Sequence, residues 1–162
     1  MRPGHSRVPL VVLPVLLVVL LVTALVLELG VRSSRALQGA HDAAIRAARQ
    51  EALNLTALDS RDLTGSLARV IAGATGAFRD DLVTRESTLA QVIPANKVVA
   101  DGTVVEAGLV RGDADTATVI VAIDATIRNV ANPQGRINAY RMRLDLERHG
   151  SRWLTSALQF VG

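Results

Sequence analysis

The sequence contains no cysteine and very few aromatic residues. Its 162 residues include 1 Trp, 1 Tyr and 2 Phe, and the formal net charge is only +3. The absence of cysteine excludes disulfides, thiolate nucleophiles and cysteine-ligated metals. Few aromatic rings and no basic stripe argue against the stacking platforms and cationic surfaces of nucleic-acid-binding proteins. We therefore expect neither a thiol enzyme nor a nucleic-acid-binding protein.

Residues that could carry catalysis or bind a metal are scattered along the chain. The three histidines, His5, His41 and His149, lack a second ligand at helical spacing. Asp124 and Asp145 are the carboxylates most suited to act as general bases, yet each belongs to the polar set of a predicted strand. A base in a pocket would instead interrupt the apolar set. The sequence thus predicts no catalytic residue, no cofactor-binding site and no metal site.

Charged residues are missing from the run VPLVVLPVLLVVLLVTALVL, residues 8–27. A helix needs about 20 apolar residues to cross the hydrocarbon core of a bilayer, and this run is long enough. A cleaved signal peptide is the alternative, but its apolar core would be about 7–15 residues long and would end at an A-x-A-like site. We expect a head (1–7) and then a retained single-pass anchor (8–29).

The orientation of the anchor is predicted from its flanks. Arg2 and Arg7 precede the apolar run, whereas Arg32 and Arg35 follow it. The positive-inside rule therefore gives only a small bias. A short basic head is easily left in the cytoplasm, so we expect a cell-membrane protein whose C-terminal domain lies outside the cytoplasm.

Beyond the anchor, hydrophobic residues first recur at helical spacing. A helix over 30–58, with Gly30 as a hinge, is expected to lead into the domain. Its inner face is a closely packing stripe of small residues, Ala40, Ala44, Ala48 and Ala52. A second helix is expected over about 63–74. A third is expected to begin at the N-cap Thr75 and to end before Pro94.

The pattern then changes to the period of two that is typical of half-buried strands. Strands are expected over the ranges 97–111, 117–127, 140–147 and 152–161. A three-residue turn at 149–151 would pair Tyr140 with Phe160, Met142 with Leu158 and Leu146 with Leu154. Three helices followed by four antiparallel strands predict an α+β domain, 59–162, with the helices on one face of a curled sheet.

Two groups of residues are candidates for binding. Inward-facing residues of the last two strands are candidates for a pocket lining: Tyr140, Met142, Leu144, Leu158 and Phe160. Tyr140, expected to pack against Phe160, is the only titratable group predicted to face inward. Five arginines could form a face that docks on acidic lipid headgroups or an acidic partner: Arg136, Arg141, Arg143, Arg148 and Arg152. The alternative is a charged, solvated sheet face balanced by Asp145 and Glu147.

Four segments resemble the Mce-associated (mammalian cell entry-associated) membrane proteins of actinobacteria. They are AARQEALNLTALDSRDLTGSLARVIAGATGAFRDD (47–81), NKVVADGTVVEAGLVR (96–111), YRMRLDL (140–146) and RWLTSALQFV (152–161). The resemblance implies a nuclear transport factor 2-like cone. It also implies a non-enzymatic role beside Mce complexes, which import lipids or sterols across the cell envelope, and it carries no catalytic motif.

Three functions are compatible with these observations. The first is an accessory subunit that stabilises or assembles a lipid-import complex, with membrane lipid and Mce transporter proteins as partners and self-association allowed. The second is a lipid- or sterol-binding module, because this fold class often encloses an apolar pocket. The third is an enzyme of the ketosteroid-isomerase type, which would need an inward-facing Asp or His.

Overall fold

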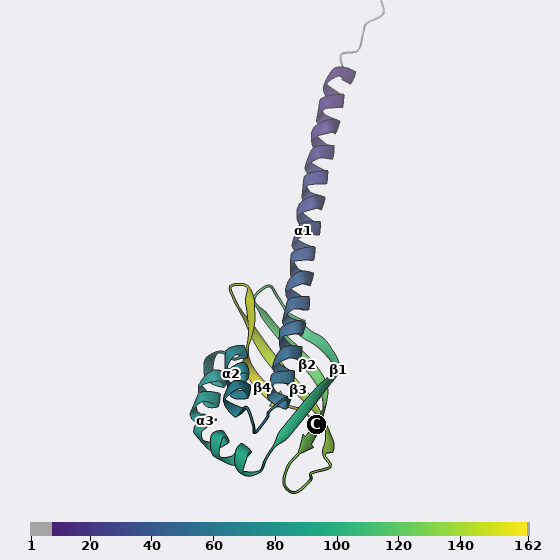
Figure 1. Ribbon diagram of the computed structural model, residues 1–162. Helices are drawn as coiled ribbons and strands as arrows, with labels where there is room; N and C mark the ends of the chain where they lie inside the picture. The colour runs from purple at the N-terminus through teal and green to yellow at the C-terminus, as the bar shows by residue number, and fades with distance from the viewer. Residues whose placement is uncertain (1–7, 162) are drawn as a thin grey trace, which may run out of the picture. The chain divides into compact units, whose positions relative to one another are not determined.

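The structure of the chain, a computed structural model, describes residues 8–161 and, over 8–33, only part of the side chains (Figure 1). The predicted head (1–7) lies outside the described residues. The described elements are, in order, α1 (Val8–Thr56), α2 (Leu63–Gly73), α3 (Gly76–Ala95), β1 (Val99–Gly112), β2 (Thr116–Arg128), β3 (Arg136–His149) and β4 (Arg152–Phe160). The strands form one antiparallel sheet in the order β1-β2-β3-β4. The predicted succession of helices and antiparallel strands is confirmed.

Helix α1 contributes to two compact units, Met1–Gln38 and Gly39–Gly162. The helix continues through Gly30, so the hinge expected there is wrong. Five leucines before the division are 59–69% exposed: Leu17, Leu20, Leu21, Leu25 and Leu27. Within the described residues, no helix is both long enough and apolar enough to cross a membrane.

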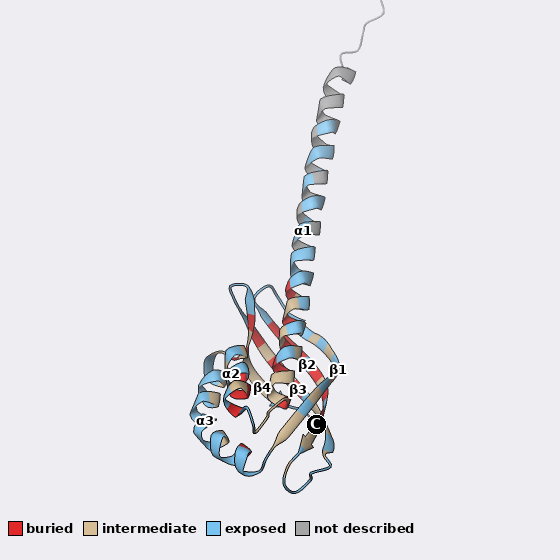
Figure 2. Cartoon of the chain, viewed as in Figure 1, coloured by how far each residue is buried: buried red, intermediate tan, exposed pale blue. Residues whose placement is uncertain are grey.

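The core of the second unit lies between α1 and the sheet. Ala44, Ala48 and Ala52 are 0% exposed. They belong to one cluster with the inward-facing side chains of β2 and β3, namely Val119, Val121, Ile123, Met142, Leu144 and Leu146. Buried positions gather where the helix crosses the strands (Figure 2). Because alanine has no side chain beyond Cβ, the helix backbone can approach the sheet closely. The predicted alanine stripe is therefore the helical side of the core.

Helices α2 and α3 pack beside β4. The Asp62 carboxylate caps α2 by accepting a hydrogen bond from the Gly65 N–H at 3.1 Å. Between the helices, Ala74 forms a parallel bridge with Thr155, and the Thr75 N–H donates to the Thr155 carbonyl oxygen at 2.8 Å. The connection between α2 and α3 therefore covers the edge of β4 at Thr155.

The predicted end of α3 before Pro94 is wrong by two residues, because α3 includes Pro94 and ends at Ala95. Pro94 lies in the last turn, and the Asn96 N–H still donates to the Val92 carbonyl oxygen at 3.3 Å. Ile93 is 6% exposed and packs in a second small core cluster with residues of α2. Burial of Ile93 thus stabilises a helical end that the local preference of a residue before proline disfavours.

The turn between β3 and β4 is shorter than predicted. His149 pairs with Arg152, so only Gly150 and Ser151 form the turn. Gly150 has φ 64°, a left-handed conformation that two-residue hairpin turns require and that glycine adopts at little cost. The predicted three-residue turn is therefore wrong, and the register moves by one residue.

A β-bulge in β4 moves the register once more. Asp145 pairs with Ala157 but Leu146 pairs with Thr155, which leaves Ser156 as the extra residue. Trp153, at 8% exposure, takes the core position that was predicted for the half-buried Leu154. Beyond the bulge the predicted apolar residues return to the inner face, in the pairs Met142↔Phe160 and Leu144↔Leu158.

Candidate functional site

The predicted pocket residues belong to a packed core or to its margin. Met142 and Leu144 are 1% and 0% exposed and lie beneath α1, whereas Tyr140 and Leu158 are half-buried beside them. Phe160 is 65% exposed. The two clefts described below have other linings. The structure therefore places four of these side chains in the core or against it and leaves Phe160 exposed, and none of the five lines either cleft.

One predicted contact within this group is confirmed. The Tyr140 and Phe160 rings meet edge to face, with ring centroids 5.7 Å apart and an interplanar angle of 60°. This geometry is the favoured one for two aromatic rings. The pair closes the margin of the core at the end of β4.

The five predicted docking arginines do not share one face. Arg148 donates to the Gly150 and Ala114 carbonyl oxygens, and Arg152 donates to the Ala72 carbonyl oxygen at 2.7 Å. Arg143 pairs with Asp145 at 3.2 Å. Arg136 and Arg141 make no ion pair with any described residue.

Strand alternation separates those two unpaired arginines. Arg136 pairs with Ile127 and has the parity of the inward-facing Tyr140, whereas Arg141 pairs with Ala122 on the outer face of the sheet. Both arginines are exposed. Only Arg141 and Arg143, of the predicted set, therefore lie on the outer face of β3.

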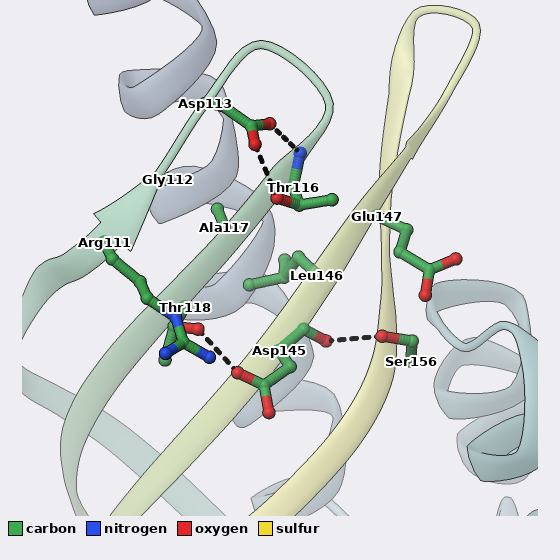
Figure 3. Close-up of a pocket in the computed structure, with 10 residues that line it drawn as sticks. All are labelled: Arg111, Gly112, Asp113, Thr116, Ala117, Thr118, Asp145, Leu146, Glu147 and Ser156. Carbon is green, nitrogen blue, oxygen red and sulfur yellow. Dashed lines mark hydrogen bonds between the residues drawn. The ribbon is translucent and has the colours of Figure 1, made fainter.

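A cleft of about 500 Å³ lies over part of this outer face (Figure 3). Arg111 of β1, Thr118 of β2 and Asp145 of β3 are among its lining residues, and Arg111 pairs with Thr118 across the sheet. In Figure 3 the Arg111 side chain extends toward Thr118 and Asp145. The lining of the cleft thus includes charged groups of both signs.

Asp145 is the centre of the polar contacts in this cleft. Its Oδ1 accepts a hydrogen bond from the Thr118 hydroxyl at 2.6 Å and one from Arg143 Nη2 at 3.2 Å. The Ser156 hydroxyl donates to the Asp145 backbone carbonyl at 3.2 Å. Ser156 is the bulged residue of β4, so the bulge itself brings this hydroxyl to the cleft. The side chain of Asp145 is 32% exposed, which agrees with the predicted solvated face.

Asp113 fixes the loop at the end of the same cleft. Its carboxylate accepts hydrogen bonds from the Asp115 and Thr116 N–H groups at 2.8 and 2.7 Å and from the Thr116 hydroxyl at 3.0 Å. The backbone hydrogen bond from Asp115, followed by the two from Thr116, lowers the pKa of Asp113 below its ordinary value. The carboxylate therefore stays ionised and holds the β1–β2 turn.

A second cleft, of about 460 Å³, lies between α2, α3 and β4. Ile71 and Leu154 supply half-buried apolar surface, and the exposed side chains of Arg79, Glu86 and Arg152 supply charge. Leu154 reaches this cleft because the observed register turns it away from the core. The second cleft combines an apolar floor with a polar rim.

One buried titratable group was missed by the sequence prediction. Glu51 of α1 is 2% exposed, and burial raises the pKa of its carboxyl to about 7, against a smaller lowering by the Asn54 hydrogen bond. The prediction that Tyr140 alone faces inward among titratable groups is therefore wrong. Glu51 follows Ala44 by seven residues and so lies on the same helical face, a signal that the sequence contains.

The sequence comparisons identify relatives of this chain. The model of the family described as "Uncharacterized protein Rv1363c/MT1408-like" matches residues 7–162. The Mycobacterium tuberculosis protein described as "Uncharacterized protein Rv1363c" is 32% identical over 114 residues, which are 70% of this chain and 44% of that protein. The chain thus spans less than half the length of this relative.

Similar solved structures show the same fold at low sequence identity. The periplasmic domain of DotI has a TM-score of 0.60 at 11% identity, over 72% of this chain and 91% of that chain. An IcmL-like type IV secretion system protein from Legionella pneumophila has a TM-score of 0.58 at 14% identity, over 72% and 88%. A periplasmic fragment of TraM has a TM-score of 0.54 at 10% identity, over 74% and 95%. The order of helices and strands agrees with the nuclear transport factor 2-like architecture that the family resemblance implied.

Proposed function

We propose that this chain, which belongs to the Rv1363c/MT1408-like family, is a membrane-anchored, non-enzymatic accessory protein that stabilises or assembles an Mce-type lipid-import complex. The observation that carries the proposal is the filled interior of the domain. Ala44, Ala48 and Ala52 of α1 pack against the inner face of the sheet and are 0% exposed. A domain whose interior is packed in this way has its outer surfaces available for binding.

An anchor at 8–29 is part of this proposal. Residues 8–27 contain no charge, and the five described leucines within them are more than half exposed. Exposure of so many large apolar side chains in one helix is unfavourable in water and favourable in a bilayer. The solved domains that share the fold include two described as periplasmic, DotI and the TraM fragment. These observations support a domain on the outer side of the membrane.

The orientation can be tested with two C-terminal fusions. Because the basic head is short, we expect the C-terminus to lie outside the cytoplasm. An alkaline phosphatase fusion should be active, and a green fluorescent protein fusion exported by the Sec route should be dark. An inactive phosphatase together with a fluorescent reporter would overturn the proposed orientation.

The docking surface that we propose is the outer face of β2 and β3. Ile120 and Arg141 are exposed there, and the cleft beside Asp145 makes part of this face concave. The inner face is covered by α1, and the edge of β4 is covered by Ala74 and Thr75. An acidic surface on an Mce subunit would complement Arg141.

A pair of charge reversals on β3 tests this docking surface. Full-length protein is extracted in mild detergent and recovered by a tag, and co-purified Mce subunits are quantified by mass spectrometry. Arg141→Glu should lower their recovery about tenfold, because it places like charges together. The matched control is Arg136→Glu, at an arginine that is also exposed but has the opposite strand parity, and it should leave recovery unchanged. An equal loss of co-purified subunits in both variants, or no loss in either variant, would remove the outer face from the proposal.

A second candidate, a lipid- or sterol-binding module, is favoured by the cleft between α2, α3 and β4. Its apolar floor and arginine-bearing rim suit an anionic amphiphile. Leu154→Trp would fill this cleft with a larger side chain. If lipid binding is the function, that change should abolish both co-purification of lipid and lipid uptake in cells. If docking is the function, uptake should persist.

A further inference from the structure

Glu51 lies on α1 against the C-terminal end of α2. Its carboxylate packs against Gly73, the last residue of α2, so closely that a Cβ at that position would collide with the Glu51 carboxylate. Gly73 is followed by Ala74, which bridges Thr155 of β4. The carboxyl group is therefore in contact with the segment that covers the edge of β4.

The hydrogen bonds around this carboxyl group are incomplete. Oε2 accepts one hydrogen bond, from Asn54 Nδ2 at 3.2 Å, and Oε1 has no partner among the described atoms. The Thr155 hydroxyl, in a residue that is 1% exposed, has no described partner either. A buried carboxylate with one hydrogen bond and no cation is strongly disfavoured relative to the neutral acid.

Four arginines on the surrounding elements have partners of their own. They form Arg49–Glu106 at 3.1 Å, Arg61–Asp59 at 2.7 Å and Arg69–Asp62 at 3.7 Å, and Arg152 donates to the Ala72 carbonyl oxygen at 2.7 Å. Arg46 of α1 and Arg79 of α3 are exposed and make no ion pair with a described residue. His149, which contacts Thr75 at 3.5 Å and Glu147 at 3.6 Å, is the other titratable group beside the α2–α3 connection. No described cation pairs with Glu51.

We propose that Glu51 is a proton-sensitive switch: the neutral acid keeps the end of α2 packed on α1 and β4, and ionisation releases Gly73–Thr75 and uncovers the β4 edge at Thr155. The released edge would present unpaired backbone groups to a partner strand. The switch regulates access to an edge of the sheet that is distinct from the outer-face docking surface.

The direction of the switch follows from burial. Desolvation raises the pKa of Glu51 to about 7, so the packed state is favoured at lower pH and weakened as the pH rises through that value. The carboxylate can regain water by movement of α2, whose contact with α1 here is a glycine and not a large side chain. Displacement of the α2 end is thus the least disruptive response to the charge.

Amide hydrogen exchange of the full-length protein in detergent micelles tests the switch. The reporter is the Thr75 N–H, which is bonded to the Thr155 carbonyl oxygen, and the reference is the Val121 N–H in the centre of the sheet. After correction for intrinsic exchange rates, protection of Thr75 should fall about tenfold per pH unit between about pH 4.5 and about pH 7 and then level off, whereas protection of Val121 should fall by a smaller factor.

Four variants make the experiment decisive. Glu51→Gln and Glu51→Met, both uncharged and of similar length, should each make Thr75 protection independent of pH. His149→Gln and the exposed Glu86→Gln should retain the wild-type response. Constant protection of Thr75 in the wild type, the same decline in both Glu51 variants, loss of the response in His149→Gln, or a parallel decline at Val121 would each overturn the proposal.

Discussion

Replacing Leu144 with alanine should lower the free energy of unfolding by about 2–5 kcal/mol. Leu144 is 0% exposed and pairs with Val119 on one side and with Leu158 on the other. The alanine face of α1 lies in the same cluster, so the helix offers no long side chain that could move to fill the space. The cost therefore includes both the lost apolar burial and the remaining cavity.

Ile137→Ala is the matched control on the same strand. Ile137 is 69% exposed, and removal of its side chain should change the free energy of unfolding by less than about 0.5 kcal/mol. Both variants can be measured by urea unfolding in mild detergent, with Trp153 as the fluorescent probe because it is the only tryptophan and is 8% exposed. A Leu144→Ala cost as small as that of Ile137→Ala would show that the inner face is wrongly assigned.

Much of the fold was predictable because the buried residues of a helix or strand recur at regular intervals in the sequence. The alanines of α1 recur every four residues, and every second residue of β2 from Ala117 to Ile127 is apolar. Such repeats extend over several turns or strand pairs, so a local exception does not hide them. The order of elements and the inner faces of β2 and β3 follow from these repeats.

The register of β4 could not be predicted in the same way, because it depends on two single-residue events. Gly150 and Ser151 form a turn that could equally have been read as three residues long, and Ser156 is inserted as a bulge. Each event moves every later side chain of β4 to the opposite face. Their combination explains why Trp153 is in the core although Leu158 and Phe160 keep the predicted parity.

The candidate sites were predicted less well than the fold, because they depend on how side chains meet across elements. The predicted pocket residues are apolar and inward, as expected, but sequence spacing does not reveal that α1 fills the space above Met142 and Leu144. The arginines are clustered in sequence, yet strand parity and backbone carbonyls divide them. Glu51 interrupts an alanine-rich face, and a heptad count from Ala44 would have marked it.

The second large effect concerns Glu51 and the pH dependence of stability. Glu51→Gln should raise the free energy of unfolding at pH 8.5 by up to about 3 kcal/mol relative to the wild type and have little effect near pH 4.5. The ordinary pKa of 4.5 is raised to about 7 in the folded state. Because the pKa is raised by folding, the contribution of Glu51 to stability is fully present below its pKa in the unfolded state. That contribution is lost as the pH rises through its pKa in the folded state. Each pKa unit of difference corresponds to about 1.4 kcal/mol.

The measurement is a series of urea unfolding curves between pH 4.5 and 8.5, with Glu86→Gln as the exposed control. Wild type and Glu86→Gln should lose stability in parallel above pH 4.5, with the loss complete above about pH 7. The free energy of unfolding of Glu51→Gln should depend less on pH, by the amount that Glu51 contributes.

If α2 yields locally when Glu51 ionises, the folded state relieves part of the penalty, and the global loss of stability should fall short of about 3 kcal/mol while Thr75 exchange accelerates. A full loss without faster Thr75 exchange would instead mean that the carboxylate is held rigidly in the core until the whole domain unfolds. Identical pH profiles for wild type and Glu51→Gln would show that Glu51 is not the buried acid that the structure indicates.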